Sequence, residues 1–170
     1  MDTQLAIASR REVRDYDGRP LPDDVVERIL DAGRLAGSAK NRQPWTFVVV
    51  EDAAAREALA AAVYEPGSVR AAGLVVGLLV SGKGPVSFDA GRAAQNMLLA
   101  AWNEGVGGSP NGLADREAAH AAVGAGEDEQ LAIVLTFGRP ARPRDPGARD
   151  AAAWSARARR RPLSELVRRR

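Results

Sequence analysis

The distribution of apolar residues constrains the fold of this chain more than any other feature of its sequence. Three short runs, at residues 46–50, 74–80 and 131–137, are rich in β-branched and aliphatic side chains. Their length and composition predict buried β-strands. Longer segments with apolar residues at helical spacing separate them, as at residues 21–37 and 90–104. A sheet of this kind must be covered by the helices between its strands, so the pattern predicts an α/β or α+β fold.

The remaining segments complete an order of helix, helix, strand, helix, strand, helix, strand, helix, strand. Further helices are predicted at residues 3–10, 53–63 and 114–123. In this order the glycine-rich segment 106–111 stands at the third strand position, before the helix at residues 114–123. The Glu-Pro-Gly-Ser sequence at residues 65–68 is predicted to break the helical structure that precedes it.

The length of the chain predicts one domain. Two halves of a 170-residue chain would be too small to bury good cores, and no internal repeat marks a boundary. Residues 139–170 are rich in Pro, Arg and Asp and are predicted to form an extended C-terminal arm.

Composition excludes several kinds of chemistry. There is no cysteine, which excludes disulfides, thiolate nucleophiles and iron–sulfur clusters, and the single histidine, His120, disfavours a metal site. Residues 1–14 are polar and do not resemble a signal peptide. The longest apolar run, residues 71–80, is too short to span a bilayer. We therefore expect a cytoplasmic protein with no membrane partner.

The charge of the chain is small overall but uneven. The formal net charge is +2, and basic residues collect at residues 157–170. This is not the general excess of a nucleic-acid-binding protein, so no nucleic-acid partner is expected; a salt-dependent contact through the tail, in a colourless protein, is the alternative. Lys40 and Lys83 are the only lysines. Arginine binds phosphate with two parallel hydrogen bonds, although a codon-usage bias would explain its excess equally well.

Three segments carry groups suited to ligand binding. Arg10 and Arg14 lie four residues apart at a helix end and could converge on a phosphate, unless they only form a solvated helix end. Ser38, Asn41 and Gln43 offer donors and acceptors between a helix and a strand, where an ordinary connection is the alternative. The glycine-rich segment 105–112 would let a ligand approach the backbone, but it lacks the G-x-G-x-x-G spacing and follows a helix.

Together these segments resemble the nitroreductase family. SRREVRDYDGRPLPDDVVERILDAGRLAGSAKNRQPWTFVVV resembles the opening of the family, with a Ser-x-x-Asn-x-Gln-Pro-Trp motif that runs into a strand. DAGRAAQNMLLAAWNEGVGG resembles its central helix and glycine turn, LAIVLTFGRPA its last core strand, and RRRPLSELV its C-terminal signature. The resemblance covers nearly the whole chain. It implies an α+β fold, with a central sheet flanked by helices, in a homodimer that binds two flavins at its interface.

The resemblance also implies which residues bind FMN. The basic turn at residues 10–14 and Arg160 would hold the phosphate, and a backbone N–H near Asn111 or Gly112 would face N5. Arg70, just before the second strand, would lie by N1 and O2. Ser38, Asn41 and Gln43, called here the flavin-edge motif, would lie at the edge of the flavin. The complete set of candidate cofactor-binding residues is Arg10, Arg11, Arg14, Ser38, Asn41, Gln43, Arg70, Ser109, Asn111, Gly112 and Arg160.

The activity implied is that of an FMN-dependent NAD(P)H oxidoreductase. Electrons would pass from NADH or NADPH to a small organic acceptor, of nitroaromatic or quinone type, by a ping-pong mechanism. No side chain is expected to be catalytic, because flavin N5 accepts the hydride. A flavin-binding or flavin-storing protein without turnover, and another flavin chemistry on the same scaffold, are the alternatives.

The sequence departs from the family pattern in two places. Glu12 stands where many members have Ser, so it is expected to turn away from the phosphate. A short glycine-proline connection at residues 80–89 replaces two helices that wall the substrate pocket in many members. The flavin face is therefore expected to be more open, or to be covered by residues 142–154.

Overall fold

The computed structural model describes all 170 residues, which divide into two compact units. The larger unit is Arg11–Pro143, and the smaller combines Met1–Arg10 with Arg144–Arg170. The larger unit contains the whole β-sheet and the two apolar clusters.

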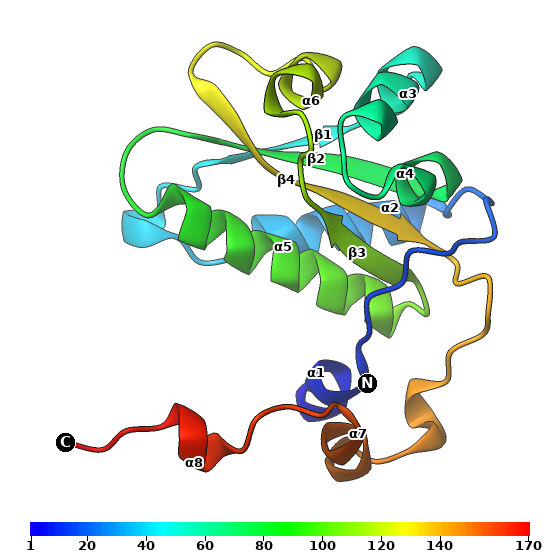
Figure 1. Ribbon diagram of the computed structural model, residues 1–170, viewed down its shortest axis with the longest axis vertical. Helices are drawn as coiled ribbons and strands as arrows, with labels where there is room; N and C mark the ends of the chain where they lie inside the picture. The colour runs from blue at the N-terminus through cyan, green and yellow to red at the C-terminus, as the bar shows by residue number, and fades with distance from the viewer. The chain divides into compact units, whose positions relative to one another are not determined.

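The sheet of the larger unit has four strands in the order β1-β2-β4-β3, and all neighbours are antiparallel (Figure 1). The strands are β1 (Trp45–Val49), β2 (Leu74–Ser81), β3 (Gly107–Asn111) and β4 (Glu129–Gly138). The predicted strands are all present, and the α+β prediction is confirmed. β1 and β3 are the two edge strands, so segments attached to them lie at opposite sides of the sheet.

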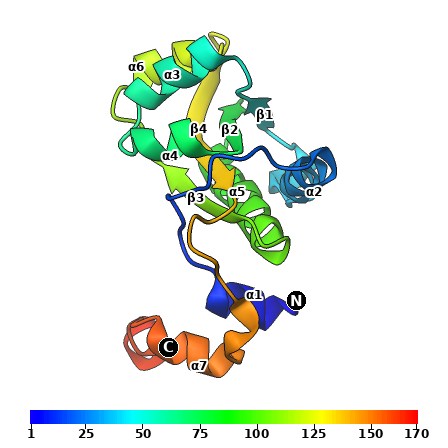
Figure 2. The same ribbon diagram turned by 90° about the vertical axis from the view of Figure 1, so that its right-hand side faces the viewer.

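Helices cover both faces of this sheet (Figure 2). α2 (Asp23–Arg34) and α5 (Val86–Asn103) pack on one face, and α3 (Ala53–Ala61), α4 (Pro66–Ala71) and α6 (Arg116–Ala122) on the other. Successive side chains of a strand point to opposite faces, and both faces of β2 are buried. The strand therefore has a continuous apolar sequence instead of an alternating one.

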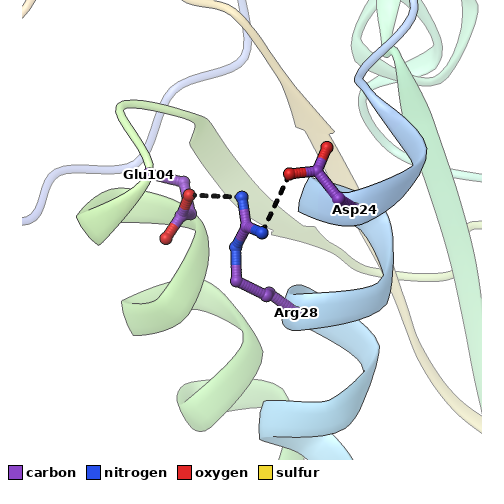
Figure 3. A network of polar contacts seen from close by, with 3 residues as sticks. All are labelled: Asp24, Arg28 and Glu104. Atoms are coloured by element: carbon purple, nitrogen blue, oxygen red, sulfur yellow. Dashed lines mark hydrogen bonds and ion pairs between the residues drawn. The ribbon is translucent and has the colours of Figure 1, made fainter.

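An ion network joins the two helices on one face (Figure 3). Arg28 of α2 lies 2.9 Å from Asp24 on its own helix and 2.9 Å from Glu104 at the end of α5. The hydrogen bond that Arg28 donates to Glu104, and then the one that it donates to Asp24, raise the pKa of the Arg28 guanidinium. The three side chains are partly exposed, so the network serves mainly to align α2 with α5.

Two boundaries predicted in the larger unit were wrong. Residues 66–71 form helix α4 instead of only a break, because Pro66 occupies the first helical turn, where its fixed φ favours a helix. α5 begins at Val86, four residues before the predicted start. Asp89 does not cap this helix; it lies in the first turn and accepts a hydrogen bond from the backbone N–H of Ala39 at 3.0 Å.

The smaller unit contains the helix predicted near the N-terminus, and its C-terminal part is helical where an extended arm was predicted. It contains α1 (Thr3–Ser9), a 3₁₀ turn at Pro146–Ala148, α7 (Ala151–Arg157) and α8 (Leu163–Leu166). Within this unit α1 packs against α7. The side chain of Asp150 caps the start of α7 by accepting a hydrogen bond from a backbone N–H. Capping side chains satisfy the free backbone N–H groups at the start of such short helices. The composition of the segment did not indicate these caps. No helix anywhere in the chain has the length and hydrophobicity needed to cross a membrane.

Candidate functional site along the edge of β3

The outer edge of β3 connects two of the predicted binding segments. β3 pairs with β4 on one side, while its other side meets two loops. The carbonyl of Gly108 accepts a hydrogen bond from the N–H of Val13 at 3.2 Å, and that of Gly112 accepts one from Tyr64 at 3.1 Å. The four residue-to-residue steps from Gly108 to Gly112 span about 13 Å at the usual strand rise. The edge is thus an elongated strip with the basic turn at one end.

Two of the glycines on this strip are required by packing. A Cβ on Gly107 would lie 2.7 Å from the side chain of Val13, and one on Gly108 would lie 2.8 Å from the ring of Phe137. The close approach predicted from this glycine-rich segment is therefore made, at these two positions, by the protein's own side chains. At Gly112 a Cβ would lie 3.1 Å from the ring of Tyr64, which is 71% exposed.

Asn111 anchors the far end of the strip. Its buried amide oxygen accepts a hydrogen bond from the N–H of Glu65 at 3.1 Å, and its amide nitrogen donates to the Glu65 carbonyl at 2.9 Å and to Ser68 Oγ at 3.2 Å. The side chain is therefore fully used inside the protein, and Asn111 offers only backbone to a ligand. The N–H of Gly112, the next residue, makes no hydrogen bond within the chain. Its donor is available to a ligand at this end.

Tyr16 holds the basic turn against the sheet. Its buried hydroxyl lies within hydrogen-bond distance of the Val13 carbonyl and, at 3.0 Å, of Thr136 Oγ1 on β4. Burial raises the pKa of the Tyr16 hydroxyl to about 12, an effect that outweighs the hydrogen bond from Thr136. Nothing in the sequence pattern around Tyr16 indicated this role, because it depends on a strand 120 residues away.

Replacing Tyr16 with Phe is expected to lower the free energy of unfolding by about 1–2 kcal/mol at neutral pH, because buried hydrogen bonds are lost. The unfolded tyrosine ionises near its ordinary pKa of 10 and the folded one near 12. The native protein should therefore lose roughly 2–3 kcal/mol as the pH rises through this interval. Urea unfolding at a series of alkaline pH values measures both effects. Tyr16→Phe should abolish that alkaline loss, whereas Tyr64→Phe should retain it; equal profiles for the two variants would contradict the assignment.

The flavin-edge motif lies at the other side of the sheet. Ser38, Asn41 and Gln43 precede β1, and Ser38 Oγ accepts a hydrogen bond from the Gln43 N–H at 2.8 Å. Lys40, Asn41 and Gln43 all adopt left-handed backbone conformations, with φ of 53°, 53° and 51°. Non-glycine residues rarely adopt this conformation, and strain of this kind concentrates at binding sites. β2 and β4 separate the motif from β3, so one subunit does not bring these two sets of residues together.

The remaining candidates lie elsewhere. Arg70 pairs with Glu57 on α3 and lowers the pKa of that carboxyl, while Ser68, two residues earlier on α4, is the residue that reaches Asn111. The sequence predicted only a break at residues 65–68 and so gave no indication of this role of Ser68. Arg10, whose backbone N–H caps α1, and Arg160, which is exposed, belong to the smaller unit.

Comparison with known proteins identifies the class. The sequence model of the nitroreductase family matches residues 7–79 and 86–139, and the chain belongs to this family. The match includes the basic turn, the flavin-edge motif and all of β3. It is interrupted only at residues 80–85, which are the last two residues of β2 and the short connection to α5.

Individual relatives agree with this assignment. An NADH dehydrogenase of Thermus thermophilus is 38% identical over 76 residues, which are 45% of this chain and 37% of that protein. A protein of Methanothermobacter thermautotrophicus, assigned as an NADH dehydrogenase/NAD(P)H nitroreductase, is 31% identical over 112 residues, 63% of this chain and 59% of that one. The matches thus span less than two thirds of these relatives. A crystal structure from Desulfovibrio desulfuricans, assigned as a nitroreductase and in complex with FMN, has a TM-score of 0.82 and 28% identity, and covers 100% of this chain and 98% of that one.

Proposed function

We propose that the chain is an FMN-dependent oxidoreductase that passes electrons from NADH or NADPH to a small organic acceptor by a ping-pong mechanism. Nitroaromatic and quinone compounds are the acceptor types that we would test first. The observation that carries the proposal is the β3 edge, which joins a pair of arginines to an open backbone N–H. The FMN complex of a structural relative that covers the whole chain supports the choice of cofactor.

The donor set on this edge fits FMN. Arg11 and Arg14 lie on either side of Glu12 and Val13, and the Val13 N–H donates a hydrogen bond to Gly108. These two arginines would hold the phosphate at this end. At the other end the Gly112 N–H would face the ring, and residues 109–111 would offer only backbone, because the Ser109 and Asn111 side chains are buried. Arg10 and Arg160 stay candidates for the phosphate, and Arg70 would need to leave Glu57 to reach the ring.

The separation of the two motifs supports a homodimer. In one subunit β2 and β4 lie between β3 and β1, the strand that follows the flavin-edge motif, so the two motifs belong to opposite edges of the sheet. We infer that Ser38, Asn41 and Gln43 of a second copy complete each site. A symmetric pair of chains would form two such sites, which is the commonest symmetry of protein oligomers.

Within this site the protein positions the cofactor, and bound FMN would supply the hydride and electron transfer. The Gly112 N–H would orient the reactive edge of the ring without a side chain above it. Polar groups of Ser38, Asn41 and Gln43 would stabilise negative charge that develops on the reduced ring. No acid, base or nucleophile of the chain is needed for this chemistry, consistent with the absence of cysteine.

Absorption spectroscopy of the purified protein tests the proposal. We expect a flavin spectrum that NADH or NADPH bleaches and that a nitroaromatic compound restores. A flavin spectrum that neither nucleotide bleaches would favour a storage protein. A colourless protein that binds no added FMN would contradict the proposal, and a salt-dependent complex with nucleic acid would then point to the basic tail.

A further inference from the structure

A cavity of about 260 Å³ lies beside the flavin-edge motif. It is enclosed by residues that precede β1 and by the short connection between β2 and α5, and two of its lining residues, Arg42 and Lys83, are cations. Lys40 lies in the same segment as Arg42. Both lysines of the chain are therefore found in the two segments that form this cavity.

These cations lack the carboxylate partners that several other basic residues of the larger unit have. Arg19, Arg28, Arg34 and Arg70 each form an ion pair at 2.9 Å or less. No ion pair is formed by Arg42 and Lys83, which line the cavity, or by Lys40 in the adjoining turn. Unpaired charges of one sign around a concave surface create a potential that attracts the opposite charge.

The single carboxylate at the cavity does not neutralise them. Asp89 is buried, accepts the hydrogen bond from Ala39 at 3.0 Å, and has Arg92 as its nearest cation at 3.9 Å. The charge of Asp89 is thus balanced by the Ala39 N–H and by Arg92, and Asp89 forms no ion pair with Lys83. With Arg42, Lys83 and Asp89 as its charged lining residues, the cavity keeps a net formal charge of +1.

The two segments are fixed relative to one another. Arg42 Nη1 donates a hydrogen bond to the Lys83 carbonyl at 2.9 Å, which ties the connection to the flavin-edge motif. The left-handed conformation of Lys40 and Asn41 is held within the same short turn. A lysine in a left-handed conformation costs stability, and such strain is retained where the surrounding structure and function require it.

We propose that Arg42 and Lys83, with Lys40 beside them, form a subsite for the anionic group of a substrate that reacts at the flavin. The cavity is smaller than a site for a whole aromatic substrate, and it suits a carboxylate or phosphate group. The inference rests on the proposed function, because residues 38–43 would bring this cavity to the flavin bound by the other subunit. The anion is either the carboxylate of the acceptor or a phosphate of the pyridine nucleotide.

Steady-state kinetics with matched substrates test this subsite and distinguish its two sources. The acceptors are 4-nitrobenzoate and the neutral 4-nitrobenzyl alcohol, and the donors are NADH and NADPH. In the Lys40→Gln, Lys83→Gln double variant, KM for the anionic substrate should rise about tenfold or more, while kcat/KM for the neutral acceptor changes less than about twofold. Arg42 is left intact because its hydrogen bond also supports the loop.

The control variant is Arg19→Gln, which removes one exposed positive charge that is paired with Asp17. A rise in KM confined to nitrobenzoate identifies an acceptor carboxylate, and one confined to the nucleotides identifies a phosphate. Equal changes for neutral and charged substrates, or the same change in Arg19→Gln, would overturn the subsite.

Calorimetric titration with inorganic pyrophosphate provides a readout that does not depend on turnover. We expect the double variant to bind pyrophosphate at least about tenfold more weakly than the wild-type protein. Unchanged binding would reject the subsite even if the protein were active. Failure of the proposed function shows itself separately, as a protein with no reducible flavin.

Discussion

Replacing Arg11 and Arg14 together with alanine is expected to give a folded but colourless protein. A charge-assisted hydrogen bond to phosphate contributes about 1.5–3 kcal/mol. Two lost side chains would therefore weaken FMN binding by roughly 10²- to 10⁴-fold. Flavin content after desalting gives the first measurement, and titration with FMN gives the change in Kd.

Two further variants give this experiment its controls. Arg19→Ala removes an arginine that is paired with Asp17, and it should retain full flavin content. Lysine at positions 11 and 14 should bind FMN with intermediate affinity, since it keeps the charge but loses the planar fork. If the double alanine variant retained wild-type affinity for FMN, the β3 edge would not be the phosphate site.

Two inactive variants are expected to restore activity when they form mixed dimers. The first carries Arg11→Ala and Arg14→Ala, and the second carries Asn41→Asp and Gln43→Glu, which place negative charge where the reduced ring becomes anionic. If each site uses β3 of one subunit and residues 38–43 of the other, a mixed dimer contains one intact site. Random pairing of equal amounts should recover about a quarter of wild-type activity per subunit.

Each variant on its own provides the baseline for this mixing experiment. Both should stay folded and dimeric by circular dichroism and size-exclusion chromatography. A mixture that never exceeds the activity of its parents, although mixed dimers are isolated by two different tags, would show that each site lies within one subunit. Flavin content of the mixed dimer distinguishes this result from a general loss of FMN binding.

Local chemistry explains why the sequence predicted most of the fold. The three apolar runs could be strands because β-branched and aliphatic side chains suit a buried sheet, and β2 reads as continuous because both of its faces are covered. The same reasoning misplaced the start of α5. Asp89 is an ideal cap by composition, but its carboxylate is used by the backbone of a distant turn.

The sequence by itself determined the apolar core strands, most helices of the larger unit, the α+β class and the family, because these follow from periodicity and from motifs that are contiguous in the chain. Only the tertiary structure decided which motifs share a surface. Strand order placed the basic turn with β3 and the flavin-edge motif at the opposite edge, and it turned Asn111 inward to Glu65 and Ser68. Pairing between strands far apart in sequence depends on the packing of both sheet faces, and no local pattern records it.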